Sequence, residues 1–172
     1  MLQFDCGGEQ WVFEICFETG LNEEKNSNDI EFMETLLDRI EKGGIAAPAP
    51  IEQRWTASSS SFMSPANGCV GGLHSWIGII MYLPSENLLQ RNAITNAFKT
   101  EYCKIMRNVG KDFNATSHWA KLEMPENIEE RDELRKLMRE KYPVDLFNQA
   151  RNTFDPKGIL SNPIIQAAFD SN

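Results

Sequence analysis

Two short segments of the chain carry side chains whose types and spacing suit chemistry. The first is Glu52-Gln53-Arg54, which follows Pro48 and Pro50. Proline excludes helix and drives the residue before it into an extended conformation, so we expect this segment to be a strand. Residues two apart on a strand face the same side. Glu52 and Arg54 would therefore share a face, either as an ordinary ion pair or as a carboxylate and guanidinium that bind a polar ligand.

The second segment is His118-Trp119-Ala120-Lys121, within a stretch that we predict to be a short strand ending at Pro125. Strand alternation would place Trp119 and Lys121 on one face and His118 on the other. A lysine beside an aromatic ring suits an electron-rich ligand. The alternative is that these residues only support the fold.

The sequence does not predict other common kinds of site. The two histidines, His74 and His118, have no acidic cluster beside them, so no metal site is predicted. Serines 58–61 lack both a GxSxG context and a paired base, and the glycine pairs match neither GxGxxG nor a P-loop. The four cysteines show no CxxC spacing and are expected to be reduced thiols.

The charge of the chain argues against nucleic acid as a partner. The 172 residues carry 25 acidic and 17 basic side chains, a net charge of −8. Such a balance repels a phosphate backbone. The acidic residues concentrate in 22–41 and 126–141, where solvated helix faces explain them. The length and composition are typical of one globular domain or a large part of one, and the sequence has no apolar run long enough to span a membrane.

Apolar periodicity predicts strands that alternate with helices. Strands are expected over 10–18, around Glu52, and over 73–83. A helix should begin near Asn28 and end at Gly43, and its buried stripe should be Ile30, Met33, Leu36, Leu37 and Ile40.

Further helices are predicted over 86–106, 126–141 and 144–152, with a last helical segment at the C-terminal end. Ser85 would cap the first of these, and Gly110 would lie beyond its end. The predicted fold class is α+β.

Several segments together resemble a known family. The motifs "FDCGG", "EQRWTA", "SWIGIIMYLP", "HWAK" and "ILSN" occur in this order. This order is similar to that of the aldonolactone oxidoreductases, flavoproteins of the vanillyl-alcohol-oxidase superfamily, and above all to the plant-type galactono-1,4-lactone dehydrogenases. The resemblance covers essentially the whole chain.

The resemblance implies a fold and a division of the chain. Residues 1–142 would form part of a substrate cap domain, with an antiparallel sheet flanked by helices. Residues 143–172 would be a helical return segment that packs against an FAD-binding domain, and the part that binds the FAD pyrophosphate would precede residue 1.

The resemblance also implies an activity. The family oxidises L-galactono-1,4-lactone to ascorbate, with hydride transfer to FAD and cytochrome c as electron acceptor, in mitochondria. The matching catalytic residues are Glu52, Arg54 and Lys121. The residues matching the cofactor site are Arg54, His118, Trp119 and Lys121.

Two positions depart from the family pattern. Ser58 stands where plant members carry a basic residue, and Phe62 stands where they carry proline. The FAD-binding half expected before residue 1, together with Ser58, motivates the alternative. It is a non-catalytic homologue that acts as a structural or assembly subunit of mitochondrial respiratory complex I. A plain α+β binding module is a third interpretation.

Overall fold

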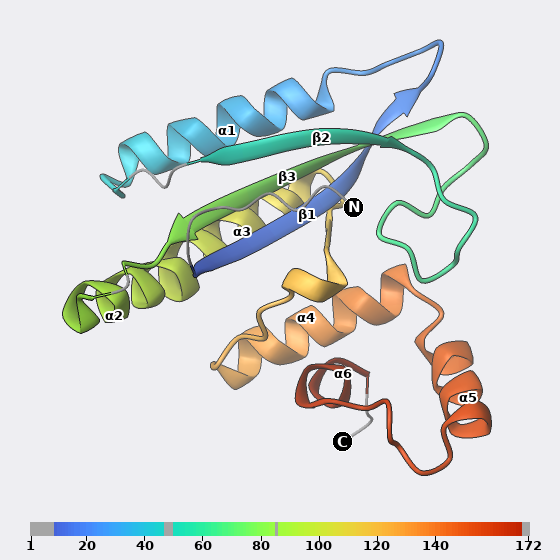
Figure 1. Ribbon diagram of the computed structural model, residues 1–172. Helices are drawn as coiled ribbons and strands as arrows, with labels where there is room; N and C mark the ends of the chain where they lie inside the picture. Colours follow the sequence, from blue (N-terminus) through green and yellow to red (C-terminus); the bar gives the residue numbers. More distant parts are fainter. Residues whose placement is uncertain (1–8, 47–49, 85, 170–172) are drawn as a thin grey trace.

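In the part of the chain that the structure describes, one antiparallel sheet of four strands organises the fold (Figure 1). The computed structural model describes residues 9–46, 50–84 and 86–169. In spatial order the strands are β2 (Ile51–Ala57), β3 (Gly72–Tyr82), β1 (Gln10–Leu21) and β4 (Thr116–Ser117). The three long strands match the predicted ones, and the α+β class is confirmed.

Helices follow the strands along the chain. They are α1 (Asn28–Lys42), α2 (Leu88–Ala97), α3 (Cys103–Asp112), α4 (Ile128–Lys141), α5 (Val144–Phe154) and α6 (Pro163–Phe169). A π-helical segment (Phe98–Tyr102) joins α2 to α3, and a 3-10 turn (Trp119–Lys121) follows β4. Among the residues described, no helix is long and apolar enough to cross a membrane.

One face of the sheet builds the main core. In the β1–β3 pair, Phe13 lies opposite Ile79 and Ile15 lies opposite Ile77, so apolar side chains from both strands project to the same side. Helices α1 and α3 cover this face. Their buried contributions to the cluster include Phe32, Leu36, Ile40, Met106 and Val109. The opposite, polar face of the sheet carries Glu14 and Glu18 of β1 and His74 and Trp76 of β3.

The buried stripe of α1 differs from the expected one. Leu36 and Ile40 are buried as predicted, and Met33 packs against the core, but Ile30 is 61% and Leu37 is 49% exposed. Phe32 is fully buried in their place, because it contacts the ring of Phe17 on β1 at a centroid distance of 5.0 Å. Helix α1 is thus rotated about its own axis, relative to the predicted orientation, so that Phe32 faces the core while Ile30 and Leu37 face solvent.

The second long helical region also departs from the prediction. The side chain of Asn87 caps α2 by accepting a hydrogen bond from the Gln90 amide, whereas Ser85 lies outside the described residues. Gly110 lies inside α3, which ends at Asp112. A side chain at this position would press against Ala115 and Ile15, so the glycine allows α3 to approach the sheet closely.

The C-terminal helices form a second, smaller core. Leu134 and Met138 of α4 and Ala168 and Phe169 of α6 are buried together in this cluster. Arg135 of α4 also donates to the carbonyl of Ala167 at 2.5 Å. Helix α6 therefore packs on α4. The proposed division into 1–142 and 143–172 remains a prediction.

The rotation of α1 predicts different effects for two substitutions on the same helix. Phe32→Ala should reduce the free energy of unfolding by about 3–5 kcal/mol, because it leaves a cavity in the core. Ile30→Ala should change it by less than about 0.5 kcal/mol, because the side chain is mostly in solvent. Urea denaturation of both variants measures the difference. Equal losses would contradict the observed orientation of α1.

Candidate functional site

Strand β2 presents Glu52 and Arg54 on the face of the sheet opposite the main core. In the β2–β3 pair, Glu52 lies opposite Gly78 and Arg54 lies opposite Trp76. The intervening side chain of Gln53 points the other way and donates to the Ser75 hydroxyl at 3.1 Å. The predicted strand and the shared face of Glu52 and Arg54 are both confirmed.

The partner of Arg54 is Glu14, a residue of β1 that is 1% exposed. Arg54 Nε donates to Glu14 Oε1 at 2.8 Å, and Arg54 Nη2 donates to Oε2 at 3.1 Å. This bidentate geometry fixes the plane of the guanidinium. The predicted alternative of a Glu52–Arg54 ion pair is thereby replaced, within the described part of the chain, by an ion pair between β2 and β1.

Lys121 binds the same carboxylate from a different element. Its Nζ lies 2.9 Å from Glu14 Oε2. Residues 119–121 form a 3-10 turn and not the predicted strand, because the side chain of His118 accepts a hydrogen bond from the Ala120 amide at 3.1 Å and starts the turn. The His118 amide also donates to the Glu14 carbonyl at 2.9 Å. The turn aims Lys121 at Glu14.

The guanidinium of Arg54 also contacts an aromatic ring, that of Trp76 on β3. Arg54 lies over the ring of Trp76 at 4.6 Å from the centroid, within the range of a cation–π contact. Trp76 itself donates to the Thr56 hydroxyl at 2.9 Å, and its other neighbours in a small buried cluster are Cys16 and Ala66. Ala66 belongs to the loop between β2 and β3, so this loop folds back over the polar face of the sheet.

Glu52 occupies the same face at some distance from Glu14. Both residues lie beside Gly78 of β3, on opposite sides. Two strand spacings of about 4.8 Å each separate their backbones by roughly 10 Å. Glu52 is exposed, and the glycine between the two carboxylates contributes only backbone. A ligand that lies over Gly78 could contact Glu52 on one side and the Arg54 guanidinium on the other.

The electrostatics follow from burial and pairing. Burial alone would raise the pKa of Glu14, but the hydrogen bonds from Arg54 and Lys121 outweigh it and lower the pKa. The Glu14 hydrogen bond raises the pKa of Arg54 in turn. The lowered pKa of Glu14 and the raised pKa of Arg54 keep this ion pair charged near neutral pH. With Lys121 as a second cation on the same carboxylate, the group carries one net positive charge.

His118 and Trp119 have different surroundings. The ring of His118 lies edge-on to Trp76 at 5.6 Å, and burial lowers its pKa, so it is a neutral neighbour of the cations. Trp119 instead packs on Tyr142 and Phe169, and its Nε1 donates to the Met63 carbonyl at 2.6 Å. The structure thus brings Arg54, Lys121 and His118 together and turns Trp119 toward the C-terminal core. The cofactor contact of Trp119 remains a prediction.

Ser58 lies apart from the cations, next to His74. The two polar atoms, Ser58 Oγ and His74 Nδ1, are 3.4 Å apart. A side chain at Gly72 would collide with the Ser58 hydroxyl, so this glycine makes room for the pair. In the described ranges, no three His, Cys, Asp or Glu residues gather as metal ligands would, and Cys16, Cys69 and Cys103 are free thiols.

Glu14 was missed by the sequence reasoning, although a signal was present. It is a lone charged residue within "QWVFEICF", a segment predicted to be a strand buried on at least one face. A carboxylate buried on a strand requires compensating charges, so its position alone predicts cationic partners from elsewhere in the chain. Which cations these are cannot be deduced from spacing, because Arg54 and Lys121 are far away in sequence.

The fold and the site define the chain as an α+β domain that holds two cations on one face of an antiparallel sheet through a single buried carboxylate. The chain belongs to the D-arabinono-1,4-lactone oxidase family, whose model matches residues 2–168. This agrees with the resemblance inferred from the sequence motifs.

The chain is also similar to plant dehydrogenases of known name. It is 46% identical over 170 residues to L-galactono-1,4-lactone dehydrogenase 1, mitochondrial, from Oryza sativa subsp. japonica. It is 45% identical to the mitochondrial L-galactono-1,4-lactone dehydrogenase of Arabidopsis thaliana, and 43% to that of Brassica oleracea. These matches cover 98% of this chain but only 28–29% of each relative, in its C-terminal part.

The family implies FAD, and the cations fit part of that cofactor. The side chain of Arg54 is 43% exposed and that of Lys121 is 30% exposed, so both keep surface for a further anionic partner beside Glu14. Their net positive charge suits the flavin ring, which becomes negative when it is reduced. The sequence has no GxGxxG or P-loop for the pyrophosphate.

The ion pairs of Glu14 predict a stability that depends on pH. Because the pKa of Glu14 is lowered in the folded state, its contribution is present above the ordinary value of 4.5 and is lost as the pH falls through the lower folded value. Glu14→Gln should therefore cost about 2 kcal/mol of unfolding free energy near neutral pH and progressively less in acid. Urea denaturation across this range measures the difference.

The control is Glu34→Gln on the exposed face of α1. It should show no comparable loss at neutral pH. A cost of Glu14→Gln that stays constant down to strongly acidic pH would contradict the ion-pair explanation.

Proposed function

We propose that this chain forms the substrate-side part of an FAD-dependent dehydrogenase that oxidises L-galactono-1,4-lactone to ascorbate. The observation that carries the proposal is the arrangement around Glu14, which holds Arg54 and Lys121 on the same face as Glu52. Family membership and the names of the plant relatives support the substrate.

Each charged residue has a role that follows from its position. Glu52 is exposed, so its carboxylate accepts hydrogen bonds from lactone hydroxyls and orients the ring. Arg54 is held by Glu14 in one plane and stays protonated, so it stabilises negative charge that develops during oxidation. Lys121 adds a second positive charge from the opposite side of Glu14.

The cofactor would lie against these cations. Arg54, Lys121 and His118 would hold the flavin end of FAD. Trp119 belongs to the same 3-10 turn as Lys121 but packs on Tyr142 and Phe169, and its contact with the cofactor remains a prediction. Bound FAD would supply the two-electron oxidation. The rest of the FAD site would come from an FAD-binding domain or a separate chain, as the small share of each relative that is matched suggests.

Cytochrome c is the proposed electron acceptor, and the mitochondrion is the proposed location. The relatives are named mitochondrial proteins, which supports the location. The acceptor and any contact with respiratory complex I rest on the resemblance of the sequence motifs.

A chimera tests this function in an assembled enzyme. The C-terminal part of the rice dehydrogenase that matches this chain would be replaced by residues 2–171, and lactone-dependent cytochrome c reduction would be measured. We expect FAD to be bound and cytochrome c to be reduced. Glu52→Gln should lower the rate about 100- to 1,000-fold, because the carboxylate that orients the lactone is lost.

The control variant is Glu18→Gln, an exposed carboxylate at the far end of β1, which should leave the rate within about twofold of the unchanged chimera. A chimera that binds FAD but shows no turnover would overturn the proposed oxidation. If such a chimera still entered complex I assemblies, the structural subunit would become the better explanation.

A further inference from the structure

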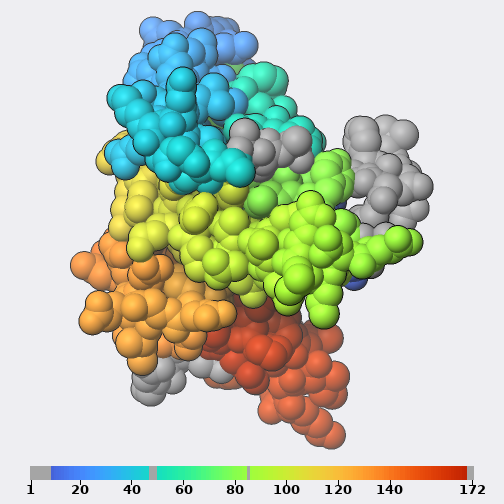
Figure 2. All heavy atoms as spheres, turned by 90° about the vertical axis from the view of Figure 1, so that its left-hand side faces the viewer, coloured from blue at the N-terminus to red at the C-terminus, as the bar shows by residue number. Residues whose placement is uncertain are grey.

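A cavity of about 260 Å³ lies between α3 and α4, where β4 pairs with β1. Figure 2 shows this side of the molecule, with α4 in orange beneath α3 in yellow. One wall is Ile15, which follows Glu14 in β1 and projects to the opposite face of the sheet. The cavity is therefore separate from the site around Glu14.

The walls of the cavity belong to two different cores. Met106 of α3 is part of the main core, whereas Leu134 and Met138 of α4 are part of the C-terminal core. These apolar side chains line the same cavity without filling it. Leu122 and Leu137 complete the aliphatic lining, and Trp119 provides an aromatic wall.

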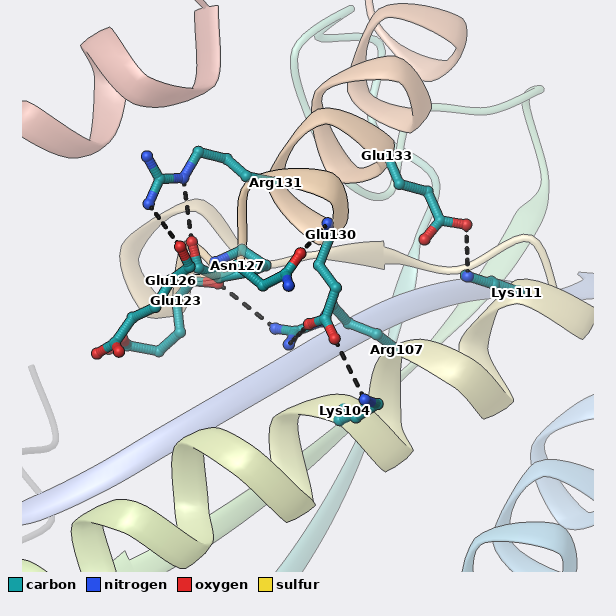
Figure 3. Close-up of polar contacts among 10 residues, drawn as sticks. Lys104, Arg107, Lys111, Glu123, Glu126, Asn127, Glu130, Arg131 and Glu133 are labelled. Atoms are coloured by element: carbon teal, nitrogen blue, oxygen red, sulfur yellow. Dashed lines mark hydrogen bonds and ion pairs between the residues drawn. The ribbon is translucent and has the colours of Figure 1, made fainter.

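Charged side chains span the mouth of the cavity (Figure 3). Lys104 Nζ lies 3.2 Å from Glu130 Oε1, and Lys111 Nζ lies 2.7 Å from Glu133 Oε1. Both pairs join α3 to α4 and are partly exposed. Exposed ion pairs contribute only about 0–1 kcal/mol each, so they part at little cost and do not bar entry.

The beginning of α4, at one side of the cavity, is anchored to the loop before it. Asn127 caps the helix by accepting from the Glu130 amide at 3.0 Å. Arg131 donates to the Pro125 carbonyl at 3.0 Å and ties the helix to the preceding loop (Figure 3).

One end of the cavity is polar. The hydroxyl of Tyr142 is buried, faces Thr116 and makes no hydrogen bond of good geometry with any residue that the structure describes. Burial raises the pKa of Tyr142 to about 12, so the hydroxyl stays a neutral donor. Lys141 lies at the same end and donates to the Asn114 carbonyl at 2.5 Å. A ligand atom that accepts a hydrogen bond would satisfy Tyr142.

We propose that this cavity binds a small phenol or quinone, with the carbon ring among the apolar walls and the hydroxyl or carbonyl oxygen attached to it at Tyr142. The volume is sufficient, because an apolar cavity of about 150 Å³ already takes benzene. A polyhydroxylated lactone suits the apolar part of the cavity poorly, since hydroxyls that face Met106, Leu134 and Met138 would find no partners there. This ligand class goes beyond the proposed oxidation of the lactone.

Thermal denaturation of the full chain with two probes tests the site. The probes are p-cresol, which donates and accepts a hydrogen bond, and tetramethyl-1,4-benzoquinone, which only accepts. At ten times its Kd, a bound probe should raise Tm by about 3–6 °C. Tyr142→Phe should weaken the binding about two- to tenfold, because the hydrogen bond is lost.

A filled cavity provides the specific control. Leu137 lies at the mouth and is 36% exposed, so Leu137→Trp can place its ring in the cavity without disturbing a core. This variant should abolish the Tm rise. Lys136→Trp, on an exposed position of the same helix, should keep it.

The outcomes separate cleanly. A rise that is lost only in Leu137→Trp establishes the site. When the two probes and L-galactono-1,4-lactone are compared at one shared concentration, the probe with the larger rise identifies the ligand as phenol or quinone. No rise with either probe, or an equal rise in both tryptophan variants, overturns the proposal, as does a larger rise with L-galactono-1,4-lactone.

Discussion

The constraint on which the site depends is the burial of one carboxylate. Glu14 lies in a strand whose neighbours, Phe13 and Ile15, belong to the main core. An ionised carboxylate loses its hydration there, and only strong hydrogen bonds to cations offset that cost. Arg54 comes from β2, and Lys121 comes from the turn after β4. The site is therefore complete only when β2 and the turn after β4 have taken their places in the folded sheet.

Sequence patterns predicted what depends on a single element. Proline stiffening and strand alternation correctly placed Glu52 and Arg54 on one face, because both properties are local to β2. They failed for residues 118–121, where the His118 side chain caps a 3-10 turn and overrides the alternation. They also could not supply Glu14 as the partner of Arg54, since the two are 40 positions apart and meet only across β3.

Helix faces show the same limit. In α1 two apolar stripes have helical periodicity, one with Ile30 and Leu37, the other with Phe32, Leu36 and Ile40. The sequence does not distinguish them, and the choice falls to the rings of Phe17 and Phe113 that Phe32 contacts. Between α2 and α3, the segment Phe98–Tyr102 is π-helical, so one turn holds an extra residue. A prediction from α-helical periodicity alone does not include this extra residue.

The pairing of β1 with β3 has a consequence for how the chain avoids misfolding. A slip of one residue would turn every side chain of β1 to the other side of the sheet. Glu14 would then enter the aromatic and aliphatic core without a cation, and Phe13 or Ile15 would face Arg54 and Lys121. Such a state carries a buried charge that is unpaired and two cations that have lost their anchor. The ion pairs of Glu14 thus disfavour a shifted pairing of β1 with β3, and they favour the register in which the site is complete.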